Sequence, residues 1–137
     1  MFVDTNFFVA LYNPADLQHK KALTAAKQIQ KDEPELILSS FVFLEVVTVL
    51  SQRAGKSLAI KAGQRLRNAD AFTFIQSTTK LEQTSWEIFQ EINKKNISFV
   101  DCSIIAVMKQ ESIPLLLTFD LEDFKILGKQ YKFTLYS

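Results

Sequence analysis

The chain has 137 residues, a length typical of one domain. Its content of 47% hydrophobic and 23% charged residues excludes a largely disordered chain. One cysteine and one histidine exclude a disulfide framework and a zinc site built from Cys and His ligands. The charged Asp4 interrupts the first apolar residues, so the sequence does not have the pattern of a signal peptide, and no apolar run approaches the ~20 residues of a membrane span. We therefore expect a single cytoplasmic domain over 1–137 with no membrane contact.

In the first half of the chain, short apolar runs alternate with segments of helical periodicity. Thr5 is a candidate N-cap of the first helix, and Ser39 and Ser40 precede the third. The pattern predicts, in order, a strand at 1–4, helices at 5–11 and 18–31, a strand at 36–38 and a helix at 41–53.

The same alternation continues in the second half, where 97–100 is a further apolar run that leads into Asp101. We expect a helix at 56–68, a strand at 72–75, helices at 79–94 and 102–110, and strands at 115–118 and 133–136. Strands that alternate with helices indicate a three-layer α/β/α fold around a central, mostly parallel sheet of four to five strands.

Three aspartates each follow an apolar, strand-like run: Asp4, Asp101 and Asp120. In a parallel α/β sheet, the carboxyl ends of the strands converge on one crevice, so these side chains are expected to meet. A fourth acid, Glu45, lies inside a strongly apolar helix that begins at the same end of the sheet, about one turn from that crevice.

An ionised carboxylate that is buried without a cation costs several kcal/mol. No Lys or Arg lies within one helical turn of Asp4, Glu45 or Asp101 in the sequence. Oxygen donors of this kind are the ligands that Mg²⁺ and Mn²⁺ prefer. A single aspartate in such a place is more often an ordinary helix N-cap, and only the four acids together favour a metal site.

Four motifs carry a resemblance to a known family. Residues 2–6 (FVDTN) resemble the opening hhDTN of PIN domains, where h is apolar, and Glu45 after 40–44 resembles their second acidic motif. Residues 98–106 are similar to the third motif, and 118–120 followed by Asp123 and Phe124 resemble the fourth, with one residue more between the two acids than is usual. The order and spacing agree over essentially the whole chain, as in toxins of the VapC type.

The resemblance implies an endoribonuclease that hydrolyses RNA phosphodiesters with Mg²⁺ or Mn²⁺. The metal ligands and catalytic residues would be Asp4, Asp101 and Asp120, with Glu45 either completing the ligand set or orienting the attacking water. We expect four further side chains to hold these groups in position: Thr5, Asn6, Thr118 and Asp123. Helix capping explains the hydroxyls and the amide equally well.

The resemblance also implies a homodimer and a small antitoxin protein whose segment blocks the site. The net charge of +1 does not indicate nucleic acid, but residues 46–69 contain five basic and no acidic residues. We expect RNA contacts there from Arg53, Lys56 and Arg65, although a solvated helix face is the commoner explanation of such a run.

Two other functions fit the same residues. An aspartyl-nucleophile phosphohydrolase also places an aspartate after its first strand, but Asn6 stands where its second acid is needed. A PIN-fold binding protein without catalysis is the second alternative, and the presence of all four acids argues against it.

Overall fold

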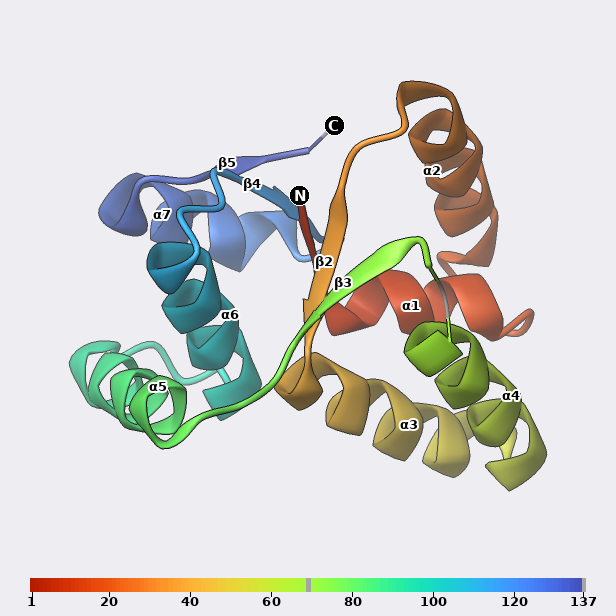
Figure 1. Cartoon of the computed structure of the whole chain (residues 1–137), viewed down its shortest axis with the longest axis horizontal. Helices are drawn as coiled ribbons and strands as arrows, with labels where there is room; N and C mark the ends of the chain where they lie inside the picture. Colours follow the sequence, from red (N-terminus) through yellow and green to blue (C-terminus); the bar gives the residue numbers. More distant parts are fainter. Residues whose placement is uncertain (69, 137) are drawn as a thin grey trace.

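A five-stranded sheet forms the centre of the protein (Figure 1), as seen in a computed structural model that describes residues 1–68 and 70–136. The strand order is β3-β2-β1-β4-β5, and every pair of neighbours is parallel. The strands are β1 (Phe2–Val3), β2 (Leu36–Ser39), β3 (Phe72–Ile75), β4 (Leu115–Leu117) and β5 (Thr134–Leu135).

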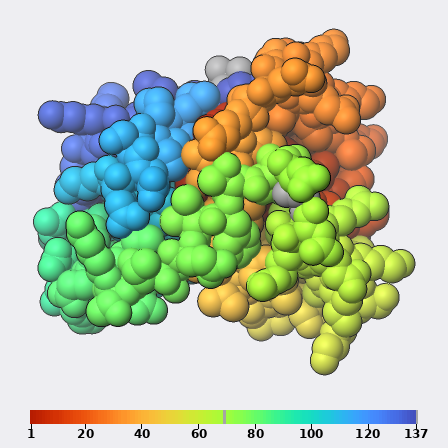
Figure 2. All heavy atoms as spheres, viewed as in Figure 1, coloured from red at the N-terminus to blue at the C-terminus, as the bar shows by residue number. Residues whose placement is uncertain are grey.

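Helices cover the sheet in two groups, the first four on one side and the last three on the other (Figure 1). Their bounds are α1 (Thr5–Tyr12), α2 (His19–Asp32), α3 (Ser40–Ala54), α4 (Lys56–Asn68), α5 (Thr79–Glu91), α6 (Phe99–Gln110) and α7 (Leu121–Tyr131). The predicted three-layer α/β/α fold is therefore confirmed, with all strands parallel. Figure 2 shows β3 and the segment after it crossing one face between the two groups.

The central strand of the sheet is β1, which has only two residues. Phe2 lies opposite Ile37 of β2 and Leu116 of β4, and Val3 lies opposite Leu117. Phe2 and Val3 are fully buried, because strands covered on both faces by helices have no solvent-facing side. The central position of β1 makes the residue after it, Asp4, a neighbour of the chain that leaves β4.

Polar side chains begin most of the helices near this end of the sheet. Asp4, not Thr5 as predicted, is the N-cap of α1, because its carboxylate accepts a hydrogen bond from the Thr5 amide. Ser39 caps α3 by accepting from Val42 N, and Asp120 caps α7 by accepting from Asp123 N.

The apolar run before Asp101 was expected to be strand-like, and this expectation was wrong. Ser98 caps a helix that starts at Phe99, so Asp101 lies in the first turn of α6. The Ser98 hydroxyl accepts from Asp101 N, and the Asp101 carboxylate accepts from Ser98 N, which is a reciprocal capping box. Among the described residues, no helix combines the length and the apolar character that a membrane span needs.

Gly128 in α7 gives a test of the packing between α7 and β5. A Cβ atom at this position would lie 2.7 Å from the carbonyl oxygen of Phe133, which is backbone and cannot turn away. We expect Gly128→Ala to lower the free energy of unfolding in urea by about 1–3 kcal/mol.

Gly63→Ala in α4 is the matched control, since its Cβ would lie 3.4 Å from a Val47 methyl group, an ordinary contact. Replacing a helical glycine by alanine should leave stability unchanged or raise it by up to about 1 kcal/mol. Equal effects of the two substitutions would contradict this account of α7 and β5.

Candidate active site

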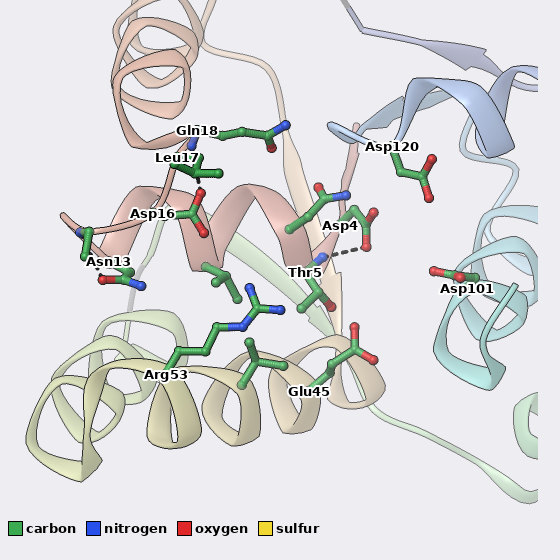
Figure 3. Close-up of a pocket in the computed structure, with 14 residues that line it drawn as sticks. Asp4, Thr5, Asn13, Asp16, Leu17, Gln18, Glu45, Arg53, Asp101 and Asp120 are labelled. Carbon is green, nitrogen blue, oxygen red and sulfur yellow. Dashed lines mark hydrogen bonds between the residues drawn. The ribbon is translucent and has the colours of Figure 1, made fainter. Parts of the chain in front are cut away.

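A pocket of about 610 Å³ opens at the carboxyl ends of the central strands. It is lined by four acidic side chains that were predicted from the sequence, and Figure 3 shows them gathered on one side: Asp4, Glu45, Asp101 and Asp120. They come from the end of β1, from α3, from the first turn of α6 and from the N-terminus of α7. The structure thus brings the four acids to one pocket, and the roles assigned to them stay predictions.

Asp4 is 4% exposed and both of its carboxylate oxygens are held. The Thr5 amide donates to Oδ1 at 2.6 Å, and the Thr118 hydroxyl donates to Oδ2 at 2.8 Å. Because Thr118 follows β4, the second bond ties the end of β1 to the end of the neighbouring strand. The Asp4 side chain therefore has a fixed orientation.

Thr118 and Asn6 form the centre of a small polar network. The Asn6 amide nitrogen donates to Thr118 Oγ1 at 3.1 Å, and Asn6 Oδ1 accepts from Phe119 N at 3.0 Å. Thr118 Oγ1 also accepts from Asp120 N at 3.0 Å. Both residues were expected to hold the acids in position, and their contacts link Asp4 to the segment that carries Asp120.

Thr5 differs from these two residues. It lines the pocket, it is buried, and its Oγ1 is the one buried side-chain polar atom without a hydrogen-bond partner in the described parts of the chain. An unsatisfied buried hydroxyl costs about 1–3 kcal/mol, so a partner from a bound ligand or water would stabilise it. This orphaned hydroxyl beside Asp4 is a sign that the pocket receives a ligand.

Asp123 does not line the pocket, although it was expected to support the site. Its carboxylate pairs with Lys94, and this is the one ion pair between side chains over residues 1–68 and 70–136. With the extra residue, Asp123 follows Asp120 by three positions. Asp120 is the N-cap of α7, and Asp123 lies in the first turn of this helix. Asp120 is the member of the fourth motif that lines the pocket.

Burial and mutual repulsion act on the pocket acids. Burial raises the pKa of Asp4 to about 7; the hydrogen bonds from Thr118 and Thr5 oppose the shift, and the charges of Asp101 and Glu45 add to it. Burial likewise raises the pKa of Asp101, and Glu45 and Asp120 contribute in the same direction. In the described chain none of the four acids is paired with a Lys or Arg, so their charges are not neutralised within the protein.

Of the three predicted RNA contacts, only Arg53 lines the pocket. Lys56 lies outside it, and Arg65 lies in a separate pocket together with Tyr12 and Lys61. The other half of the pocket wall is the loop between α1 and α2 (residues 13–18), which was not predicted to belong to the site. In the sequence, Asn13 and Pro14 stand between the helices predicted at 5–11 and 18–31 and indicate a turn, but they do not indicate what the turn faces.

A family model described as PIN domain matches residues 1–130. The chain belongs to the PIN-domain family. The sequence resemblance is therefore confirmed, and the relatives extend it to VapC toxins. The 23S rRNA-specific endonuclease VapC20 of Mycobacterium tuberculosis is 32% identical over 129 residues, covering 93% of this chain and 94% of the relative.

Solved structures show the same architecture. The crystal structure of Mycobacterium tuberculosis VapC20, described as a Sarcin-Ricin loop cleaving toxin, matches this PIN domain with a TM-score of 0.81 at 30% identity, covering 93% of this chain and 94% of that one. The VapBC2 structure from Rickettsia felis, bound to a DNA fragment from their promoter, matches with a TM-score of 0.69 at 18% identity, covering 98% and 96%. The second match shows the fold alone.

The pocket of this PIN domain fits a divalent metal in the chemistry of its donors. Four carboxylates and the orphaned Thr5 hydroxyl are hard oxygen ligands, and no cation among the described residues pairs with the acids. Over the same residues, however, no group of three or more acidic, histidine or cysteine side chains already stands close enough to hold an ion. Side-chain movement would therefore accompany the binding of an ion.

The raised pKa of Asp4 predicts how stability depends on pH in the presence of a chelator. Between pH 3.8, the ordinary pKa of an aspartate, and pH of about 7, the folded protein holds a proton on Asp4 that the unfolded chain releases. The free energy of unfolding therefore falls by up to about 4 kcal/mol as pH rises through this window. Above the window it no longer changes with the ionisation of Asp4.

Asp4→Asn should remove this contribution, so the variant gains stability relative to the wild type as pH rises from 4 to 8. Urea unfolding at several pH values measures the difference. A constant difference between the two proteins across this range would show that Asp4 has an ordinary pKa.

Proposed function

We propose that this PIN domain is an endoribonuclease that hydrolyses RNA phosphodiester bonds with Mg²⁺ or Mn²⁺, and that it is the toxin of a type II toxin-antitoxin pair. The observation that carries the proposal is the gathering of four carboxylates without a cationic partner in one pocket. The 32% sequence identity to a 23S rRNA-specific endonuclease, over 93% of this chain, supports RNA as the substrate class.

The chain's own residues supply three parts of the mechanism. Asp4, Asp101 and Asp120 would hold the metal, and the Thr118 and Asn6 network keeps Asp4 and the Asp120 segment in place before substrate arrives. When bound, a divalent ion supplies Lewis acidity toward a phosphate oxygen and lowers the pKa of a bound water. Glu45 has no hydrogen bond among the described residues and is available to orient the attacking water.

The proposal predicts metal-dependent cutting of RNA. With Mn²⁺ or Mg²⁺, the purified protein should cleave 23S rRNA or mixed single-stranded RNA, and a chelator should stop it. Asp101→Asn should lower the rate by at least about 100-fold because a metal ligand is lost, while the Asn side chain can still accept the hydrogen bond from Ser98 N. Gel analysis of the RNA products measures the rate.

Glu111→Gln is the matched control, since it removes an exposed carboxylate at the other end of the same helix. Equal activity of the wild type and Asp101→Asn would reject an enzymatic role and favour a binding protein. A covalent phosphoryl adduct on Asp4 would instead support the aspartyl-nucleophile phosphohydrolase.

An antitoxin partner is the second part of the proposal. Three solved relatives of this fold are the VapBC2 complex, FitAcB from Neisseria gonorrhoeae and a toxin-antitoxin complex from Klebsiella pneumoniae. On this chain, an apolar groove of about 530 Å³ lies between α1 and α2 and includes Phe7, Leu11 and Leu23. Such a groove suits the apolar side of a small protein's segment.

The absence of a disulfide pair is consistent with action in the cytoplasm.

A homodimer is the third part, and an aromatic row is the surface that supports it. Trp86 stacks on Phe89 with ring centroids 6.0 Å apart, and the row continues through Phe99 to Phe41. Trp86 is 48% and Phe89 40% exposed. Adjacent aromatic rings left open to water favour association with another apolar surface.

We expect the wild type to sediment as a dimer and Trp86→Lys to sediment as a monomer, because a charge in the row opposes its burial. The control is Ile126→Lys, which changes an exposed apolar residue outside the row, on α7; this variant should remain a dimer. Analytical ultracentrifugation distinguishes the two states. A monomeric wild type would exclude the dimer at the concentration used.

A further inference from the structure

The pocket has two chemically different halves, and the four predicted acids account for only one of them. Figure 3 shows the four acids on one side and Arg53 with the α1–α2 loop on the other. Of the fourteen residues that line the pocket, Arg53 is the one cation. The second half also holds one carboxylate, Asp16, whose Oδ1 accepts a hydrogen bond from Gln18 N, but it contains the one side chain of the pocket lining that can attract an RNA phosphate.

The position of Arg53 follows from the helical repeat of α3. Glu45, Val49 and Arg53 are spaced by four residues, so they lie along one face of the helix, and all three line the pocket. Eight residues of α-helix separate the backbones of Glu45 and Arg53 by about 12 Å. The backbone of Arg53 is therefore displaced along α3 from that of Glu45, toward the side of the α1–α2 loop (Figure 3).

Arg53 is free to bind an anion. Its side chain is exposed and makes no ion pair with any carboxylate of the described chain, and the guanidinium points into the pocket (Figure 3). A guanidinium binds phosphate through two parallel hydrogen bonds, which fixes orientation as well as charge.

The loop opposite Arg53 offers amide groups at a defined place. Asn13 Oδ1 accepts from Ala15 N at 3.1 Å, and Asp16 Oδ1 accepts from Gln18 N at 2.8 Å, so the loop is held by its own bonds. Among the described residues, the side-chain NH₂ groups of Asn13 and Gln18 have no hydrogen-bond partner, and both residues line the pocket. Side-chain amides recognise the edges of unpaired bases, as in single-stranded RNA recognition.

We propose that this second half is a subsite for the nucleotide that flanks the scissile phosphodiester: Arg53 binds its phosphate, and the Asn13 and Gln18 amides contact its base. The inference rests on the proposed ribonuclease function and adds to it the part of the pocket that selects the RNA sequence at the cut. Arg53 sets affinity for any RNA, whereas Gln18 sets preference among bases.

The test measures binding without cleavage. In an Asp4→Asn background with chelator present, fluorescence anisotropy gives the affinity for four homopolymeric RNA hexamers (A, C, G and U) at several salt concentrations. Arg53→Gln should lower the affinity for every hexamer about tenfold and reduce the salt dependence by about one counterion. Lys109→Gln, which removes a charge at the far end of α6, should change neither.

Gln18→Ala should reduce the differences in affinity among the four hexamers and leave the salt dependence unchanged, because it removes a neutral base contact. Equal affinities of the Arg53→Gln and Lys109→Gln proteins would overturn the subsite, as would failure of the parent protein to bind any hexamer. If the wild type still cuts RNA in those cases, only the subsite is lost. If it cuts no RNA, the proposed function itself fails.

Discussion

The repulsion among four converging carboxylates is the constraint on which the functional half of this protein depends. Burial already raises the pKa of Asp4 to about 7, and each neighbouring negative charge makes ionisation of the buried acids less favourable. A fold stabilised only by its own contacts would avoid this arrangement or place a Lys or Arg beside it. The described chain makes its one ion pair elsewhere, at Lys94 and Asp123, so the pocket keeps an electrostatic cost that a bound cation would remove.

The scaffold holds this unfavourable cluster in place by strand order. Since β1 and β4 are neighbours, the residue after each strand meets the other, and Thr118 bonds directly to Asp4. Helix N-termini add partial positive charge on the same side, because α1, α6 and α7 all begin at the acids. Backbone dipoles thus offset part of the repulsion without adding a side chain that would compete with a cation.

The sequence predicted the elements well because their apolar periodicity is strong and their ends carry clear signals. The bounds of α4 and β3 agree with the expectation. Gly55, which stands between the helices predicted at 41–53 and 56–68, is the C-cap of α3, and Asn13 is the C-cap of α1. The failures are local: residues 97–100 are apolar enough for a strand, but Ser98 and Asp101 cap each other and start a helix instead. Asp123 and the wall around Arg53 were beyond the sequence, because a carboxylate's partner and the surface that a loop faces are set by tertiary packing.

The capping roles of the acids have a consequence for comparing members of this family. Asp4, Asp101 and Asp120 each accept a hydrogen bond from a backbone amide at a helix start, so replacing them by side chains that cannot accept this bond would weaken the helix start even in a chain without nuclease activity. Each of these three acids, taken singly, therefore has a structural explanation, and only their convergence in one pocket indicates a functional site. Glu45 begins no helix and accepts no hydrogen bond within the described residues, so its structural role is the weakest of the four, and we expect its retention or loss to distinguish active from inactive members of the family.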